Sequence, residues 1–526
     1  MSTRRQNSSG LGWSRRRFLT ASRALVAWPV LSGPAASLVK AHAKLAESPF
    51  SLGVASGDPT PDGVVLWTRL APKPLEGGGM PRENVAVDWQ IADDDGFTKI
   101  AASGTAVATP DLAHTVHVEA RGLRPDRWYF YRFRAAGETS PIGRTRTAPA
   151  PDALVARLRF AFASCQHFET GLYTAWQHAA REDLDLIAHL GDYIYEYGTG
   201  TAKDLVRHHV GKEIVALDDY RTRLAQYKTD ADLQAAHALC PWIVTWDDHE
   251  FDNNCANDIS EERNVPREKF LARRAASYQA YYEHMPLRAA QLPKGPDMPL
   301  YRVVKHGRLA EFAVLDTRQY RTDQPCGDGN KPPCPEVYSE NATLLGAAQE
   351  KWLYDTLDAS SGVWNVLAQQ VMMARVDRKA GDEVHYSMDQ WPGYEANRQR
   401  VLKYFARRPE KNQVVITGDI HSNWANNLQV DSADERSPVV ATEFVGTSIS
   451  SGGNGQEGTD AAARLLAENP FVKFHNQERG YVSCEITPEK WTTHYRTVPY
   501  VKEPGAPLVT RKSFEVEAGR PGLEEV

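Results

Sequence analysis

The segment LDLIAHLGDYIYE, residues 184–196, decides the fold of this 526-residue chain. Its first seven residues are mostly apolar, and the polar sequence GDYIYE follows them directly. A short apolar run of this kind predicts a buried strand, and polar side chains just after such a strand are typical of ligand sites. We therefore expect Asp192 and Tyr195 to lie at a site beyond the carboxyl end of a strand.

Four further runs repeat this pattern along the chain. Apolar residues at 158–163, 242–246, 312–315 and 414–417 lead into SCQH, DDHE, DTR and GDIH. Helical periodicity at 266–284 and 344–357 separates some of these runs. Strands that alternate with helices predict an α/β layered domain, in which polar strand ends meet at one edge.

The residues before this region have a different pattern. Val85, Val87, Trp89 and Ile91 alternate with polar or small residues, and turns rich in Pro, Gly and Asp separate such stretches. This alternation predicts a small amino-terminal β-sandwich of the immunoglobulin or fibronectin type at residues 44–150. The sequence APAP at 148–151 reads as a linker, so we expect a second, larger domain with a carboxy-terminal extension at 151–526.

Residues 1–43 predict an export signal. The sequence RRRFL at 15–19 precedes a moderately apolar run, which ends in AHA at 41–43. A basic start, an apolar middle and a small-residue end form a secretory signal, and the paired arginines indicate twin-arginine export machinery. The alternative is a membrane anchor, but Pro29, Gly33 and Pro34 interrupt a run that is already short for a bilayer. We expect a periplasmic or secreted protein whose mature chain has no transmembrane segment.

Composition and charge narrow the function further. The chain is 42% hydrophobic and 24% charged, which is typical of a soluble globular protein. Removing residues 1–43 takes away seven basic and no acidic side chains, so the net charge falls from −6 to −13. An acidic protein of this kind is poorly suited to bind nucleic acid or an anionic membrane. We expect it to attract divalent cations and to act as a monomer.

Six cysteines fit an oxidising compartment without forming a disulfide scaffold. Cys326 and Cys334 bracket a loop rich in Gly, Pro and Asp, and we expect them to form a disulfide. Cys240 and Cys255 are a second candidate pair. Cys165 remains for another role, although it could also be a buried apolar residue or a disulfide partner.

The motifs after the strands suit phosphate ester hydrolysis. This reaction needs a nucleophilic hydroxide, neutralised phosphoryl oxygens and help for the departing alkoxide, all of which a two-metal centre supplies. Gly-Asp alone is common in turns. Here, however, GDYIY, DDHE and GDIH each follow a predicted strand, and together they indicate a metal site.

These motifs resemble the alkaline phosphatase D family, a branch of the calcineurin-like metallophosphoesterases. The resemblance rests on GVASGDP at 53–59, ASCQ at 163–166, GDYIYE at 191–196, TWDDHE at 245–250 and TGDIHS at 417–422. It implies a layered αββα sandwich of the metallophosphoesterase type, the catalytic domain at 151–526, behind the amino-terminal β-sandwich.

The resemblance also implies the metal ligands. Fe(III) would be held by Cys165, Asp192, Tyr195 and His421. Ca²⁺ would share Asp192 and also bind Asp248, Asp419 and one of Asn253 or Asn254. Compared with the wider superfamily, carboxylates replace imidazole and amide ligands at the second metal, and hard calcium prefers such ligands. Tyr195 could instead only pack among its aromatic neighbours.

Three other residues have implied or open roles. His249 stands where the superfamily places a histidine against the leaving group, so we expect it to be catalytic together with the bridging Asp192. His167 is more typical of a structural residue than of a ligand. Arg318 could bind phosphate or form an ion pair with Asp316.

We therefore expect an exported alkaline phosphatase that hydrolyses small phosphate monoesters and diesters, with attack by metal-bound hydroxide. One alternative is a phosphodiesterase or phospholipase D-type enzyme with little monoesterase activity. A second, from a different class, is a non-catalytic surface protein stabilised by calcium.

Overall fold

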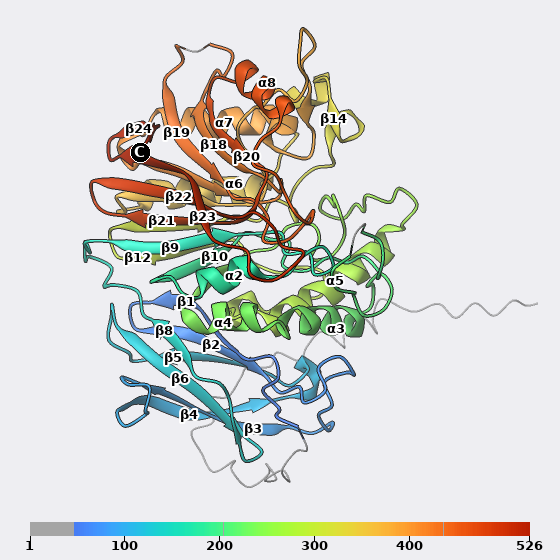
Figure 1. Ribbon diagram of the computed structural model, residues 1–526, viewed down its shortest axis with the longest axis vertical. Coiled ribbons are helices and arrows are strands. Elements are labelled where there is room, and N and C mark those ends of the chain that lie inside the picture. Colours follow the sequence, from blue (N-terminus) through green and yellow to red (C-terminus); the bar gives the residue numbers. More distant parts are fainter. Residues whose placement is uncertain (1–46, 203–204, 435) are drawn as a thin grey trace, which may run out of the picture. The chain divides into compact units, whose positions relative to one another are not determined.

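The computed structural model describes residues 47–526, apart from 203–204 and 435. The predicted export signal, residues 1–43, lies outside the described residues. Two large sheets form the centre of the described part, and helices cover their outer faces (Figure 1).

The first sheet has ten strands. Their spatial order is β24 (Arg520–Glu525), β23 (Val509–Glu517), β22 (Lys490–Val498), β21 (Arg479–Ile486), β9 (Leu158–Ala163), β10 (Leu186–His189), β11 (Trp242–Val244), β1 (Val54–Thr60), β2 (Gly63–Arg69) and β5 (Thr115–Arg121). Strands β9, β10 and β11 are parallel to one another, so their carboxyl ends lie at one edge.

The second sheet has seven strands. Their order is β12 (Arg302–His306), β13 (Ala310–Val314), β15 (Trp364–Ala368), β17 (Gln413–Thr417), β19 (Val439–Val445), β18 (Asn423–Gln429) and β20 (Val472–Asn476). The four strands β13, β15, β17 and β19 run parallel and also end at one edge.

Side chains that alternate along the strands pack on the two opposite faces of each sheet. In β9, Phe160 and Phe162 pack into the core between the two sheets, whereas Ala161 and Ala163 pack on the opposite side. That opposite side is covered by the helices α2 (Thr174–Ala179), α3 (Leu217–Lys228), α4 (Ala231–Leu239) and α5 (Arg267–His284).

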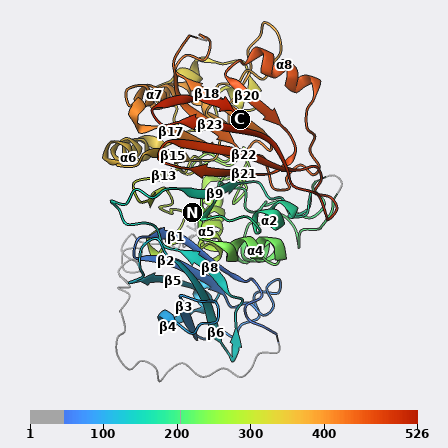
Figure 2. The ribbon, with the colours of Figure 1, turned by 60° about the vertical axis from the view of Figure 1, so that its left-hand side comes forward.

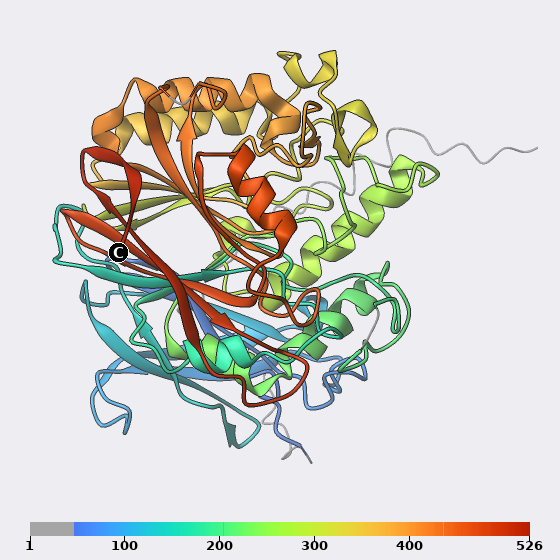
Figure 3. The same ribbon diagram turned by 45° about the horizontal axis from the view of Figure 1, so that its top comes forward.

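The outer face of the seven-stranded sheet is covered by α6 (Gly346–Ala359) and α7 (Glu395–Ala406), and α8 (Asp460–Glu468) contacts β20. Figure 2 shows α6 and α7 on one side of the two sheets and α2 on the other, and Figure 3 shows the same separation from above. The predicted αββα sandwich is therefore confirmed.

The amino-terminal β-sandwich is also present. A five-stranded sheet of β3 (Val85–Ala92), β4 (Ile100–Ala108), β6 (Trp128–Ala135), β7 (Glu138–Thr139) and β8 (Gly143–Arg146) packs against β1, β2 and β5 around one core. The second layer of this sandwich is not a separate sheet, because β1 pairs with β11 at Gly57 and Trp242 and so extends the ten-stranded sheet. This pairing covers the edges of β1 and β11, which would otherwise leave unpaired backbone groups.

Of the two expected cysteine pairings, one is present and the other is not. The predicted disulfide between Cys326 and Cys334 is present. The candidate pairing of Cys240 with Cys255 is wrong, because both are free and buried. Cys240 precedes β11 and Cys255 follows the loop beyond its carboxyl end, so the strand separates them. Among the described residues, no helix has the length and apolar character needed to cross a membrane.

Candidate metal centre

The carboxyl ends of β9, β10, β11 and β17 bring the sequence motifs together. Backbone hydrogen bonds join the first two loops, since the N–H of Cys165 donates to the carbonyl of Gly191 at 3.1 Å. Gly191 is required here, because its φ is +111° and an added Cβ would lie 2.5 Å from the Cβ of Asp247. The loop after β10 therefore packs directly against the DDHE motif.

Several of the candidate ligands share an unusual backbone conformation. Cys165, Asp192, Asp419 and His421 have φ values of +59°, +55°, +66° and +55°. Residues with a side chain adopt this left-handed region at a cost of roughly 1–3 kcal/mol each, and such strain gathers at functional sites. The surrounding packing therefore holds four candidate ligands in conformations that the local sequence alone does not favour.

The four residues expected to hold iron lie together. Ligand atoms of Cys165, Asp192 and His421 fall within 4.8 Å of one another. The Tyr195 hydroxyl donates to Asp192 Oδ2 at 2.9 Å and lies 3.1 Å from His421 Nε2. Ser451 Oγ donates to the Tyr195 oxygen at 2.8 Å. A thiol, a carboxylate, a phenol and an imidazole thus converge on one point.

The carboxylates expected to hold calcium form an adjoining group. Asp192 lies within 4.8 Å of Asp248 and His249, and Asp248 is equally close to Asp247 and Asp419. Asp192 therefore touches both groups, as a bridging ligand must.

The two candidate asparagines, Asn253 and Asn254, have different hydrogen-bond partners. The backbone N–H of Asn254 donates to Asp248 Oδ2 at 2.7 Å, and its side-chain amide donates to Asp328 at 2.9 Å. The side-chain amide of Asn253 instead donates to Glu261 at 2.6 Å. Asn254 is therefore the better placed of the two to serve the second group.

The electrostatics of this centre favour bound cations. Burial, together with the charges of Asp248 and Glu250, raises the pKa of Asp192 well above its usual value. Burial, with Asp389 nearby, raises the pKa of Asp419 to about 6. Gathering carboxylates in a buried site is costly unless positive charge compensates them.

Two carboxylate oxygens that lack hydrogen-bond partners also indicate a site for cations. Asp192 Oδ1 and Asp248 Oδ1 are buried and lack a hydrogen-bond partner among the described residues. Buried polar atoms are normally paired, so each such atom calls for an unseen partner. Carboxylate oxygens are the ligands that hard cations prefer, and the donor set therefore fits the two expected metals.

His249 lies beside both sets of candidate ligands, and Glu196 holds its ring in place. Its Nδ1 lies 2.8 Å from Glu196 Oε2, and its ring lies 4.2 Å from that of Tyr195. Burial alone would lower the pKa of His249, but the carboxylates of Glu196, Asp248 and Asp192 raise it well above its usual value. An imidazolium held in this way can donate a proton to a leaving oxygen.

Arg318 has partners that sequence reasoning missed. Its fully buried guanidinium pairs with Asp247 and, at 2.8 Å and 2.9 Å, with Asp389. The expected ion pair with Asp316 is wrong, because Arg318 donates to that carboxylate through its backbone N–H and not through its guanidinium. Arg318 Nη2 also lies 3.7 Å from Asp248 Oδ1 and from Asp419 Oδ1. The second expectation, phosphate binding by Arg318, stays a prediction.

Two carboxylates at the ends of the motifs were also missed. Glu250 accepts the backbone N–H groups of Asp192, Tyr193 and Asp247 at 2.6–3.0 Å, and so joins the two loops. Glu196 holds His249 and the backbone of Asn253. Glu196 is the last residue of GDYIYE, and Glu250 is the last residue of DDHE. Their places in these motifs could have identified them from the sequence.

His167 makes contacts that suit the structural role expected of it. Its Nδ1 accepts the backbone N–H of Glu169 at 3.2 Å, and its ring packs 4.5 Å from that of Tyr195. Burial lowers the pKa of His167 to about 3, which keeps the ring neutral.

Comparisons with known proteins identify the family of the chain. The family model described as PhoD-like phosphatase matches residues 160–495, and the model described as its N-terminal domain matches 35–149. The chain is 53% identical over 491 residues to alkaline phosphatase D from Bacillus subtilis (strain 168), covering 93% of this chain and 84% of that protein. A solved structure of PhoD has a TM-score of 0.90 and 53% identity, covering 92% of this chain and 93% of its own.

Proposed function

Because the chain belongs to the PhoD-like phosphatase family and is a phosphoric ester hydrolase, we propose that it cleaves both phosphate monoesters and diesters at a two-metal centre. Its substrates in this proposal are small phosphate esters. The observation that carries the proposal is the cluster of buried carboxylates in which Asp192 Oδ1 and Asp248 Oδ1 accept no hydrogen bond from the described residues. The nearest cation to Asp248 Oδ1 is the guanidinium of Arg318, at 3.7 Å.

We assign the two metals by the chemistry of the donors. Cys165, Asp192, Tyr195 and His421 would hold Fe(III), because a thiolate and a phenolate suit a strongly acidic cation. Asp192, Asp248, Asp419 and Asn254 would hold Ca²⁺ through oxygen atoms. When bound, the metals supply Lewis acidity that activates water and neutralises phosphoryl oxygens.

The protein's own residues complete the reaction. Glu196 accepts a hydrogen bond from His249, which orients the other nitrogen of the imidazole toward the substrate. His249 then donates a proton to the departing alkoxide. Glu250 fixes the loops that carry Asp192 and Asp247 through their backbone N–H groups, so the ligands are held in position before substrate arrives.

The test of the proposed function compares wild type with Asp192→Asn. We expect the wild type to contain both metals and to hydrolyse a nitrophenyl phosphate and its diester. The variant should lose metal and at least about 10²-fold in kcat on every ester, because both metal groups need this carboxylate. A metal-replete wild type inactive on both esters, or a fully active variant, would refute the proposal.

Iron can be checked without activity. A thiolate or phenolate bound to Fe(III) gives visible charge-transfer absorption, so the purified enzyme should be coloured. Tyr195→Phe should weaken or shift the band, whereas Tyr338→Phe, which alters an exposed tyrosine, should not. A colourless, active enzyme that contains only zinc would contradict the iron assignment.

Export, domain limits and assembly are also proposals. We propose that the twin-arginine pathway exports the protein to the periplasm or medium, with residues 1–43 removed. Replacing the arginines of RRRFL by lysine should leave a longer precursor in the cytoplasm. We also propose domains at 44–150 and 151–526 and a monomeric mature enzyme.

A further inference from the structure

Two hollows lie beside the metal centre. The first, of about 480 Å³, is lined by the candidate ligand His421 and by Arg479. The second, of about 340 Å³, lies against α8 and is lined by Arg378 and Trp424. The two hollows adjoin, because three residues line both: Ile420, Ser422 and Gln477.

Arg378 is a cation that forms no direct ion pair within the described residues, although Gln390 links it to Asp419. No ion pair joins it to any carboxylate of the described residues, and its side chain donates only to Gln390, at 3.3 Å. Burial lowers its pKa to about 10, against the charge of Asp419, which raises it. Its guanidinium carbon lies 5.2 Å from the centre of the Trp424 ring, whose other neighbour is His475 at 4.3 Å. A partly buried guanidinium over an aromatic wall is a ready binding group for an anion.

Arg479 is a second cation that forms no ion pair within the described part of the chain. Its Nε is buried without a hydrogen-bond partner. Its terminal nitrogens donate only to uncharged oxygens, which belong to Ser448, Gln477 and Ser451. The adjacent carboxylate of Glu478 is engaged elsewhere, because it pairs with Arg511 at 2.6 Å and 2.7 Å. The two hollows therefore each present one guanidinium that no carboxylate neutralises directly.

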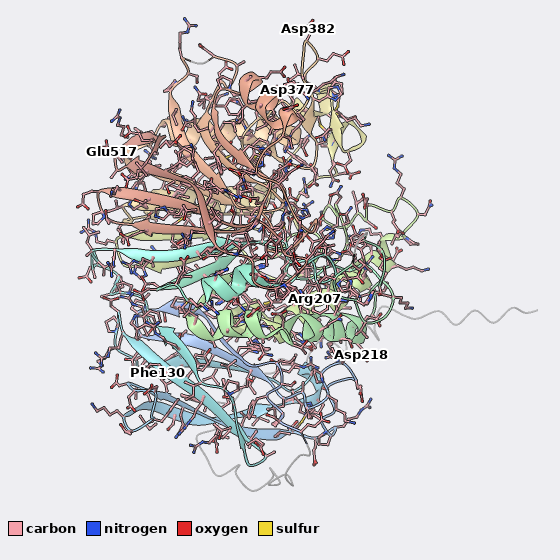
Figure 4. The ribbon with its side chains drawn as sticks, viewed as in Figure 1. Phe130, Arg207, Asp218, Asp377, Asp382 and Glu517 are labelled. Carbon is pink, nitrogen blue, oxygen red and sulfur yellow. A yellow bond between two sulfur atoms is a disulfide. The ribbon has the colours of Figure 1, made fainter. Side chains whose placement is uncertain are left out.

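The carboxylates around the second hollow hold a neighbouring loop. Asp377, which lies beside α8 in Figure 4, accepts the backbone N–H groups of Lys379 and His385 at 3.0 Å and 2.9 Å. Glu468 Oε1 accepts the backbone N–H of Gly381 at 3.0 Å. Neither carboxylate pairs with Arg378. Leaving a partly buried cation unpaired is costly, so the arrangement suits an anion that arrives from outside.

We propose that these adjoining hollows form a subsite for a second anionic group on the organic portion of the substrate, with Arg378 as its main cation. The inference rests on the proposed phosphatase function and adds a substrate class to it. While one phosphoryl group occupies the metal centre, the second anion reaches past Arg479 to Arg378. Esters with a second phosphate or a carboxylate at a suitable distance are then preferred over simple alkyl phosphates.

The test uses two substrate series with the metal-loaded enzyme. Alkanediol bisphosphates with two to six carbons are compared with alkyl monophosphates of the same length. We expect kcat/KM to favour the bisphosphate by about 10-fold at one preferred length, as one charge-assisted hydrogen bond provides. Arg378→Gln should reduce this ratio to about 1, and Arg378→Lys, which keeps the charge, should retain part of it. Metal content and Tm are measured for each variant.

One control variant and a third substrate make the result specific. Arg520→Gln removes an exposed arginine of β24 and should keep the full preference. A carboxyalkyl phosphate of the preferred length tests the anion: an equal gain indicates a general anion subsite, and a gain confined to the bisphosphate indicates a phosphate subsite. No preference at any length, or a preference that Arg378→Gln leaves intact, overturns the subsite. If the wild type hydrolyses no ester of either series, the proposed function fails instead.

Discussion

At the scale of single residues, the proposed mechanism has His249 donate a proton and Glu196 hold its imidazole ring. Proton donation to the leaving oxygen is typically worth roughly 10²–10⁴-fold. His249→Ala should therefore keep its metals and lose most on alkyl phosphates, and less on nitrophenyl esters, whose leaving groups need little protonation. Glu196→Gln should show the same selectivity with a smaller loss, because Glu196 acts only through the imidazole.

The comparison of kcat for the two ester classes checks this prediction, with metal analysis alongside. Equal losses on both classes with intact metals would show that His249 binds phosphate or orders the ligands. Loss of metal from Glu196→Gln would assign that carboxylate to the metal site rather than to His249.

Lys228 provides a second prediction for a single residue. Its fully buried ammonium packs over Trp67 at 4.3 Å and lies 3.4 Å from His237 Nε2. Burial lowers its pKa from 10.5 to about 7. Between pH 7 and 10.5 the unfolded chain binds the proton more strongly than the folded chain does, so this group makes stability rise with pH across that window.

Lys228→Met should accordingly raise the free energy of unfolding at pH 7 relative to wild type. The gain should shrink by about 1.4 kcal/mol per pH unit toward pH 10.5. Denaturant unfolding at several pH values measures it, and Lys351→Met, on the exposed face of α6, is the control. A difference that does not change with pH would contradict the assignment.

At the scale of elements, the loop closed by Cys326 and Cys334 contacts Asn254, a residue proposed to bind calcium. It carries Asp328, whose carboxylate accepts the side-chain amide of Asn254 at 2.9 Å. Replacing both cysteines by serine should reduce the free energy of unfolding by about 2 kcal/mol. It should also weaken calcium affinity, because Asn254 loses a partner that is held in place.

Calcium titration of the metal-free protein measures this effect, and Asp328→Asn is the matched variant that keeps the disulfide. Both variants should bind calcium more weakly than wild type. Unchanged calcium affinity in both would show that the loop stabilises the fold without serving the metal.

At the scale of the whole described molecule, one strand pairing joins the amino-terminal sandwich to the rest. Gly57 pairs with Trp242, and a Cβ at Gly57 would lie 2.5 Å from the carbonyl oxygen of Pro286. Gly57→Ala should therefore cost about 1–3 kcal/mol of stability. Because the ten-stranded sheet is continuous, we expect a single unfolding transition for both parts.

Calorimetry checks this expectation. Gly458→Ala, where an added Cβ meets no atom within 4 Å, should change stability by less than about 0.5 kcal/mol. Two separate transitions in wild type would show that the two parts fold independently. An unchanged Tm in Gly57→Ala would show that the close packing at Gly57 adds no stability.

Much of the architecture could be predicted locally. Apolar runs of strand length, alternation in residues 85–91 and polar strand ends are short-range patterns, and they predicted the α/β layers, the β-sandwich and the edge where the motifs meet. The disulfide between Cys326 and Cys334 was also accessible, because the two lie only 8 positions apart. Residues such as Asp192 and Tyr195 were candidates because their motif follows a strand directly.

Other features depend on contacts between distant segments, and no local pattern encodes those. Arg318 pairs with Asp247 and Asp389, each 71 positions away, instead of with its near neighbour Asp316. The continuity of β1 with β11, the separation of Cys240 from Cys255 and the hollow at Arg378 are likewise products of packing. Periodicity and propensity determine which elements form, whereas burial and the pairing of charges between elements determine which side chains meet.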